Sequence, residues 1–513
     1  YCQVMLTLAP TQRQSARLEK PGRHAIVIGS GLGGLAAAIR LGARGYRVTV
    51  LEKLDGPGGR AYVFEQDGFR FDAGPTIITA PFLLKELWAL VGRELSQDVD
   101  LRPLDPFYRI RFHDGEVLDC FAGEEDMRAE VARISPKDVE GFEAFMRRAE
   151  EIYRIGFERF GAIPFGNFRD MIKVLPEFVR LASYENVHGF VSRYVKDPRL
   201  RFALSFHPLF VGGNPFKVTS IYGLIAFLER RHGVHFAMGG TGRIVQGMVG
   251  LIQRQGNEVR YGAEVSEIIV ENGAATGVQL SSGERIKSDI VVSNADTAWT
   301  YRKLVPPSAR KRWSDKKIDR ANYSMGLFVW YFGTSRQYQD VKHHTILLGP
   351  RYKDLVTDIF KHRVLADDFS LYLHRPTATD PSLAPEGCDA FYVLSPVPHL
   401  DAGIDWTTKA EEYRRAIAQV LDSVALPGFE DHIVTSRVMT PQDFHDRLLS
   451  HKGAAFSFEP LFSQSAWFRP HNKSEDVDRL YIVGAGTHPG AGVPGVLCSA
   501  KILDKVVPHA ALL

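Results

Sequence analysis

The stretch HAIVIGSGLGGLAAAIR, residues 24–40, decides the fold of this 513-residue chain. Four of its first five residues are apolar and three of these are β-branched, which predicts a strand over 24–28. A G-x-G-x-x-G turn follows from Gly29 to Gly34, and the alanine-rich run behind it predicts a helix. A second predicted strand, 47–51, ends at Glu52. This strand–turn–helix–strand unit indicates an α/β protein with a Rossmann-like domain.

The residue types of this turn are those that a bound dinucleotide requires. Gly29 permits the tight turn, Gly31 lets the backbone approach a pyrophosphate, and Gly34 allows close packing of the helix on the strand. Free N–H groups at the helix N-terminus favour the phosphates. A carboxylate at the end of the second strand accepts hydrogen bonds from ribose hydroxyls. The expected nucleotide contacts here are Gly29, Gly31, Gly33, Gly34, Glu52 and Lys53.

Two further stretches extend the expected contact beyond a single nucleotide. Gly58-Gly59-Arg60 follows shortly after Glu52, and an arginine there neutralises a second part of a diphosphate. The run FDAGPT, residues 71–76, gives another close approach of the backbone. A long flavin cofactor needs this extension, so we predict FAD. The expected contacts are Gly59, Arg60, Asp72, Gly74, Pro75 and Thr76.

The C-terminal region carries the last glycine cluster. A predicted strand, 480–483, opens onto GAGTHPGAGVPGV, residues 484–496, and a predicted helix continues to about Val507. Amide groups near Gly495 and Val496 at the start of that helix are expected to face the flavin pyrimidine edge, where reduced flavin carries negative charge. The expected contacts are Gly484, Gly486, Thr487, Pro494, Gly495 and Val496.

The rest of the chain divides by pattern into inserts between the halves of this domain. Residues 121–232 are mostly helical in pattern and rich in aromatic side chains. Residues 301–474 contain further predicted strands and are assigned to substrate binding. A basic leader, residues 1–22, is expected to be poorly ordered. The FAD-binding domain is then assembled from residues 23–120, 233–300 and 475–513.

Composition excludes several classes of protein. The chain is 45% hydrophobic, which argues against disorder, and its net charge of +3 is too small for a nucleic-acid binder. The four cysteines are scattered without a C-x-x-C pair, so a metal site or a dithiol redox centre is not expected. A second dinucleotide fingerprint is also missing. We therefore expect reduced flavin to pass its electrons to another acceptor, oxygen or a quinone.

Several motifs resemble those of the bacterial-type phytoene desaturases, which are carotenoid desaturases of the flavin amine oxidase superfamily. They include PGGRAYVFEQDGFRFDAGPTIIT at 57–79, SFHPLFVGGNPFKVTSIYGLI at 205–225 and LYIVGAGTHPGAGVPGV at 480–496. The middle motif is the more specific to carotenoid desaturases. The resemblance covers residues 24–507.

The resemblance implies an FAD-dependent enzyme of carotenoid biosynthesis that lies on a membrane surface. It would introduce double bonds into 15-cis-phytoene and give neurosporene or lycopene. It also implies that Val265, on an insert strand, contributes backbone contacts to the adenine. The location implied is cytoplasmic and peripheral to the membrane. No stretch of about 20 apolar residues is present to span a bilayer.

A C40 hydrocarbon substrate requires a long apolar tunnel, and the aromatic insert suits both the tunnel and the membrane. One helix face, carrying Met171, Leu175, Phe178 and Ala182, is the predicted membrane contact. The reaction also needs a proton acceptor. Asp170, an acid within the apolar insert, and His207, in the middle motif, are the candidate catalytic residues.

Three other functions remain open at this point. A later carotenoid desaturase or a ketolase fits the same motifs. An amine oxidase fits the flavin motifs, and Trp467-Phe468 would supply part of the aromatic cage that such an enzyme needs. A prenyl-lipid-binding module of the dissociation-inhibitor type shares the architecture but needs no flavin.

Overall fold

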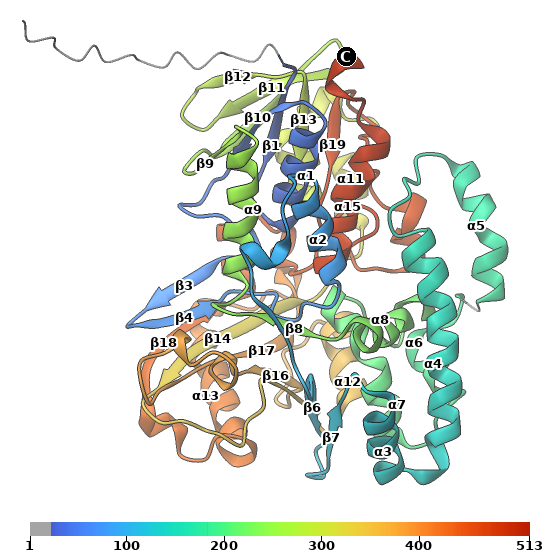
Figure 1. Ribbon diagram of the computed structural model, residues 1–513, viewed down its shortest axis with the longest axis vertical. Helices are drawn as coiled ribbons and strands as arrows, with labels where there is room; N and C mark the ends of the chain where they lie inside the picture. The colour runs from blue at the N-terminus through green and yellow to red at the C-terminus, as the bar shows by residue number, and fades with distance from the viewer. Residues whose placement is uncertain (1–21, 182, 513) are drawn as a thin grey trace, which may run out of the picture.

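The computed structural model describes residues 22–181 and 183–512. A parallel sheet with its helices forms the upper half of the molecule in Figure 1, and a larger sheet forms the lower half. A group of helices stands along one side of both halves. The predicted disorder of the leader falls almost wholly on residues 1–21, which lie outside the described residues.

The predicted Rossmann-like unit is present and the C-terminus closes it. Five parallel strands pair in the order β19-β13-β1-β2-β9. The strands are β1 His24–Ile28, β2 Arg47–Leu51, β9 Glu258–Arg260, β13 Ile290–Ser293 and β19 Leu480–Ile482. Helices α1 Leu32–Ala43, α2 Pro81–Ala89, α9 Gly242–Arg254 and α15 Val493–Val506 cover one face of this sheet.

A small antiparallel sheet covers the other face of the parallel sheet. It consists of β10 Val265–Glu271, β11 Ala274–Leu280 and β12 Arg285–Lys287. Ile26 and Leu51 of the parallel sheet share one buried apolar cluster with Ile268 and Val278 of the small sheet. Apolar residues on both faces of the central strands explain why their sequences read as continuous hydrophobic runs.

The second large sheet has seven strands in the order β18-β14-β17-β16-β15-β6-β7. Its strands are β6 Tyr108–Arg111, β7 Val117–Cys120, β14 Gly326–Thr334, β15 His344–Leu347, β16 Leu371–His374, β17 Asp389–Val397 and β18 Ile433–Met439. Neighbouring strands are antiparallel except β6 and β15. The sequence-based boundary at residue 120 was therefore wrong, because β6 and β7 extend this sheet rather than the FAD-binding domain.

Alternation along β14 separates the two faces of this sheet. Trp330 and its alternate neighbours pack in one cluster with α13, Trp406–Val424. Val329 and Tyr331 point to the opposite face and join the core beside the helical insert. The sheet therefore has a closed outer face and an inner face that is available to line a cavity.

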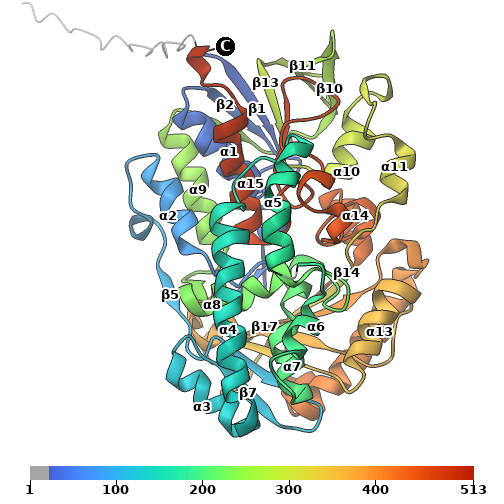
Figure 2. The same ribbon diagram turned by 90° about the vertical axis from the view of Figure 1, so that its right-hand side faces the viewer.

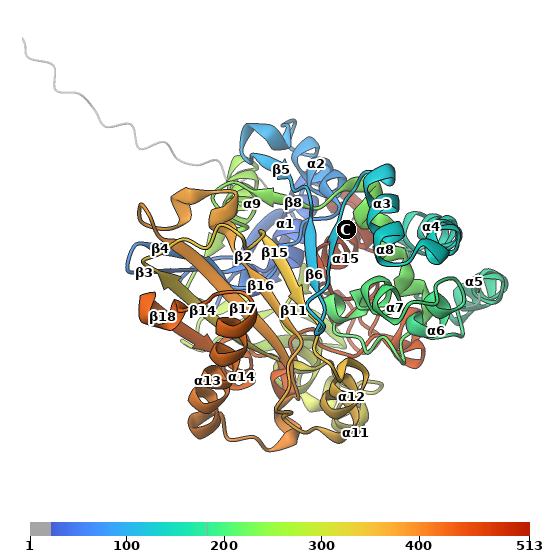
Figure 3. The same ribbon diagram turned by 90° about the horizontal axis from the view of Figure 1, so that it is seen from below.

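The predicted helical insert is confirmed over most of 121–232. Its helices are α3 Glu124–Ile134, α4 Val139–Tyr153, α5 Phe168–Arg180, α6 Val187–Ser192, α7 Pro198–Ser205 and α8 Leu224–His232. Figure 2 shows α4 and α5 as its outer elements, and Figure 3 shows the group gathered to one side of the seven-stranded sheet. Shorter elements are β3 Val63–Gln66, β4 Phe69–Asp72, β5 Leu101–Pro103, β8 His235–Ala237, α10 Thr297–Trp299, α11 Asp315–Arg320, α12 Tyr352–Thr357 and α14 Pro441–Leu448.

The helices of the described part of the chain include none with both the length and the apolar character needed to cross a bilayer.

Candidate active site

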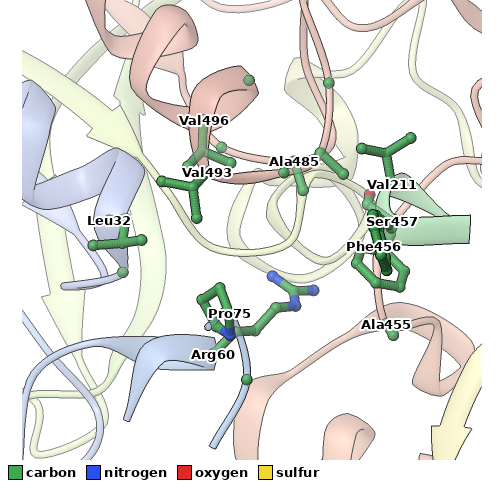
Figure 4. A pocket seen from close by; sticks show the side chains of 18 of the residues that line it. Leu32, Arg60, Pro75, Val211, Ala455, Phe456, Ser457, Ala485, Val493 and Val496 are labelled. Carbon is green, nitrogen blue, oxygen red and sulfur yellow. The ribbon is translucent and has the colours of Figure 1, made fainter. Parts of the chain in front are cut away.

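A single large cavity of about 560 Å³ connects all three parts of the fold. Its walls come from the glycine turn after β1, the inner face of the seven-stranded sheet, and the helical insert. Figure 4 shows a region where residues from the N-terminal third, such as Leu32, face residues from the C-terminus, such as Val496. The three glycine clusters of the sequence therefore meet at one site.

The glycine turn forms one end of this cavity. Gly29, Gly31 and Gly33 line it. Helix α1 begins there with no side-chain cap and no acidic residue in its first turn, so its first amides are free for an anionic ligand. Gly34 does not line the cavity. A Cβ at that position would lie 2.1 Å from the Gly29 carbonyl oxygen, so Gly34 serves helix–strand packing.

Glu52 reaches the same end from the tip of β2. Its Oε2 accepts hydrogen bonds from the Ser30 amide (2.8 Å) and hydroxyl (2.6 Å), and its Oε1 accepts one from the Leu54 amide (2.8 Å). These bonds hold a buried carboxylate at the cavity wall with lone pairs left over for ribose hydroxyls. Lys53 and Val265 also line the cavity.

Arg60 is the cation at the centre of the cavity. Figure 4 shows its guanidinium reaching between Val493 and Phe456. It donates to the Ser450 hydroxyl at 3.0 Å, and its buried Nε has no hydrogen-bond partner among residues 22–181 and 183–512. Burial lowers the pKa of Arg60, and the nearby charge of Asp296 opposes this shift. A buried guanidinium without an ion pair fits an anionic group in the cavity.

Gly59 before β3, and Gly74, Pro75 and Thr76 after β4, all line the cavity, where a cofactor can reach them. Asp72 does not, because its carboxylate accepts hydrogen bonds from the Thr241 amide (2.9 Å) and the Gly242 amide (3.4 Å) at the start of α9. Burial raises the pKa of Asp72 to about 6. The predicted cofactor contact is thus corrected to a structural link between β4 and α9.

The C-terminal cluster forms the wall opposite Arg60. Gly484, Gly486, Pro494, Gly495 and Val496 line the cavity. Thr487 is fully buried elsewhere and donates to the Pro470 carbonyl at 2.6 Å, so it is not a direct contact. The Val496 amide was also misassigned, because it donates to the Gly492 carbonyl at 2.9 Å within the helix. Val496 therefore contributes its side chain to the wall.

Sequence reasoning missed the segment after β13. Asn294, Ala295 and Asp296 all line the cavity. A Cβ on Gly33 would lie 2.6 Å from Asn294 Oδ1, which places the asparagine directly against the glycine turn. The order of the strands could have identified this segment, because the carboxyl ends of neighbouring parallel strands lie at the same edge of a sheet.

Beyond Arg60 the cavity becomes apolar. Its lining there includes Phe206, Leu209, Phe210, Leu228, Met325, Leu327, Val329, Ile346, Leu348 and Leu394. Thr76 closes one side with its hydroxyl 2.9 Å from the Tyr372 hydroxyl and 2.8 Å from that of Tyr392. Trp467 and Phe468 are not part of the lining, so the cavity lacks the aromatic pair that the amine oxidase alternative invoked.

A buried carboxylate, Glu229 of α8, interrupts this apolar region. Glu229 lines the cavity and was not predicted. The Tyr108 hydroxyl donates to its Oε1 at 2.7 Å, and His207 Nε2 lies 3.1 Å from its Oε2. Burial, and then the Glu229 carboxylate, raise the pKa of Tyr108 well above its usual value, so Tyr108 remains a donor. His207 itself does not line the cavity.

Asp170 also lies outside the cavity lining. It is in the first turn of α5, where its carboxylate accepts from the Asn167 amide in a capping box. Lys173 Nζ is 3.8 Å from Asp170 Oδ1. These contacts are those of a helix cap, so the geometry gives Asp170 no access to a substrate in this cavity.

The cavity also reaches the outer side of the helical insert. Phe178 of α5 and Phe462, which is itself exposed, both line it. On α5 the exposed large apolar side chains are Phe168 (53%), Ile172 (56%), Leu175 (52%) and Val179 (61%), which we term the α5 face. The predicted face was wrong by part of a turn, because Met171 is buried and Phe178 points inward. Ala182 lies outside the described residues.

Three buried histidines lie behind the cavity wall. One ring nitrogen of each of His343, His344 and His374 lies within 4.8 Å of the others. The Tyr372 hydroxyl is 2.6 Å from His344 Nδ1. Burial lowers the pKa of all three rings, so they are neutral and support the wall through Tyr372. The absence of a metal remains a prediction.

Comparison with known proteins places these observations in a family. The family described as flavin containing amine oxidoreductase matches residues 32–502. A neurosporene-forming phytoene desaturase of Rhodobacter capsulatus is 52% identical over 97% of this chain and 96% of its own. A lycopene-forming phytoene desaturase of Pantoea ananas is 47% identical over 93% of this chain and 97% of its own.

Solved structures share the fold at low sequence identity. An oxidoreductase from Methanosarcina mazei has a TM-score of 0.62 and 19% identity, covering 94% of this chain and 100% of that one. A putrescine oxidase solved with putrescine has a TM-score of 0.60 and 14% identity, covering 95% and 99%. These two likenesses concern the fold alone.

Proposed function

We propose that this chain, which belongs to the flavin-containing amine oxidoreductases and among them to the bacterial-type phytoene desaturases, introduces successive double bonds into 15-cis-phytoene to give neurosporene or lycopene. One observation carries the proposal. A continuous cavity leads from the glycine turn, past Arg60, through an apolar region to Phe178 of α5 and the exposed Phe462. A cavity of this shape and lining suits a cofactor at its glycine-rich end and a hydrocarbon at its apolar end.

The residues at the glycine end fit FAD. Glu52 is held ready for the ribose, the uncapped start of α1 suits the pyrophosphate, and the partnerless Nε of Arg60 suits a further polar group of the cofactor. When bound, FAD supplies the acceptor for a hydride from the substrate. The chain's own residues hold the cofactor, keep water away from the reacting carbons and take up a proton.

The apolar region suits a polyene chain, which offers no hydrogen-bonding group. Affinity there comes from burial, at roughly 0.8 kcal/mol per CH₂ relative to water. A substrate that is already dissolved in lipid gains little of this on transfer. The cavity mouth beside Phe178 and Phe462 therefore favours direct transfer from a membrane.

Glu229 is the residue that we assign as proton acceptor, in place of Asp170. Desaturation removes a hydride from one carbon and a proton from its neighbour, and the electron pair left by the proton becomes the new double bond. Tyr108 and His207 each engage one oxygen of Glu229, which orients the carboxylate while leaving lone pairs free. Apolar surroundings exclude competing water. His207, the second sequence-based candidate, then acts as a positioning residue.

The α5 face is the proposed membrane contact. Its four side chains recur at i, i+4, i+7 and i+11, so they form one stripe on the outside of the molecule. Such a stripe inserts at the boundary of headgroups and acyl chains without spanning the bilayer. The enzyme would then be cytoplasmic and peripheral to the membrane, and a lipid-soluble quinone, or oxygen, would take the electrons.

The test is product analysis with the purified holoenzyme. Phytoene in liposomes is expected to yield coloured products with more conjugated double bonds, identified by chromatography and absorption spectra. A protein that binds FAD but leaves phytoene unchanged, while converting a later carotenoid, would support the later desaturase instead. A flavin reduced by an amine would support the amine oxidase.

A further inference from the structure

A second pocket, of about 360 Å³, lies between α11 and the segment 458–470. We term it the α11 pocket. Its walls include basic, aromatic and polar side chains. The basic ones are Lys316, Lys317, Arg320 and the buried Arg469, the aromatic ones are Trp313, Phe458 and Phe468, and the polar ones are Ser314, Ser463 and Gln464.

The basic side chains of this pocket have no acidic partner in the described part of the chain. Neighbouring arginines differ, because Arg302, Arg310 and Arg312 are each paired with a carboxylate. Lys316, Lys317 and Arg320 form no such ion pair, and Lys317 Nζ instead lies 3.7 Å from the centre of the Trp313 ring. Residues 302–320 contain eight lysines and arginines but two aspartates. The α11 pocket therefore carries an excess of positive charge, although the carboxylates of Glu475 and Asp476 lie beside Trp313 and near Lys317.

The α11 pocket is continuous with the proposed membrane contact. Phe468 lines it, and its ring lies 6.2 Å from that of the exposed Phe462. Phe462 in turn packs 5.9 Å from Phe178 of α5, and Trp467 packs 5.1 Å from Phe168 of the α5 face. An apolar surface thus borders a basic pocket, with both made partly by the same short segment.

We propose that the α11 pocket binds the phosphate of an anionic phospholipid while the α5 face inserts among the acyl chains. Lysine and arginine donors suit phosphate oxygens, and the flanking rings suit the glycerol region of the same lipid. This arrangement fixes the rotation of the enzyme on the membrane and keeps the cavity mouth toward the lipid. The inference rests on the membrane contact of the proposed function and adds a lipid class to it.

The size of the effect follows from the three charges. Each basic residue that lies near an anionic membrane surface strengthens binding to that membrane. Removing all three should therefore lower the affinity for anionic vesicles by about 100-fold. This loss depends on charge, so it shrinks at high salt. Binding to neutral vesicles should change little, since the α5 face is intact.

The experiment measures flotation of the full-length holoenzyme with vesicles of phosphatidylcholine alone or mixed with phosphatidylglycerol. The variant is Lys316→Gln/Lys317→Gln/Arg320→Gln. The control, Lys85→Gln/Lys137→Gln/Lys196→Gln, removes three exposed charges from α2 and the helical insert. The wild type and the control should prefer the anionic vesicles, and the α11 variant should lose that preference.

Four results would count against the inference or against the proposed function on which it rests. An α11 variant that retains the preference for anionic vesicles overturns it. Inorganic phosphate that stabilises the wild type but not the variant, with no effect of vesicle composition, assigns the pocket to free phosphate and also overturns it. A wild type that binds neither kind of vesicle contradicts the membrane contact of the proposed function, whereas equal binding by all proteins contradicts this inference alone.

Discussion

Placing charge on the α5 face should detach the enzyme from membranes without unfolding it. Ile172 and Val179 are 56% and 61% exposed, so their replacement by glutamate leaves the protein core intact. Complete burial of such a side chain is worth about 1.5–3 kcal/mol, so inserting the exposed half of each contributes about 1 kcal/mol. The four side chains of the face together contribute about 4 kcal/mol.

The double variant Ile172→Glu/Val179→Glu loses about 2 kcal/mol of this free energy of membrane binding. Moving the charged glutamates into the membrane interface weakens binding further. Partitioning to neutral vesicles should therefore fall at least about 30-fold. Vesicle flotation measures this, with FAD content and the thermal midpoint as checks on folding.

A matched control tests whether location, rather than charge, causes the effect. Val364 and Val434 are 51% and 52% exposed and lie away from α5, in the loop after residue 362 and on β18. Val364→Glu/Val434→Glu adds the same charge and should bind vesicles like the wild type. Equal loss in both double variants, or no loss in the α5 variant, would refute the assignment of the α5 face as membrane contact.

Three further predictions concern the cavity. Glu229→Gln should lower turnover about 10²–10⁴-fold with FAD content unchanged, and a turnover within threefold of wild type would contradict its role as proton acceptor. Arg60→Met should weaken FAD binding by about 10–100-fold, as measured by flavin fluorescence during dilution; unchanged retention would contradict the contact. The pKa of Asp72 is raised to about 6, so the folded state binds more protons than the unfolded state between about pH 4 and 6. The free energy of unfolding should therefore fall as pH rises through this window. In Asp72→Asn the thermal midpoint should depend less on pH over the same range. An equal pH dependence of the midpoint in both proteins would argue against the raised pKa of Asp72.

Local sequence patterns predicted the FAD-binding half well, because its strands, turns and helix starts are set by residues that are close together in the sequence. The strand at His24–Ile28, the glycine turn and Glu52 all came from short-range spacing, and all occur as expected. The same rules misassigned Asp72 and Thr487, whose side chains bind backbone groups of elements distant in sequence. Spacing alone gives no information about which way such a side chain turns.

The substrate half depended on pairings between distant segments. Strands β6 and β7 join a sheet whose other members begin at residue 326, and no local signal links them. Glu229 was missed for a similar reason, since its partner Tyr108 comes from a strand 121 residues away and His207 from a short 3-10 helix, 207–211, that precedes α8. The resemblance to carotenoid desaturases supplied the substrate class, but the catalytic carboxylate required the packed structure.

Anaerobic mixing of the holoenzyme with phytoene in liposomes tests whether the bound flavin takes its electrons from phytoene. We expect the absorbance of oxidised flavin to fall as a longer conjugated polyene appears, with one double bond formed per flavin reduced. Flavin that stays oxidised in the presence of phytoene, or that is reduced without any new double bond in the lipid phase, would contradict it.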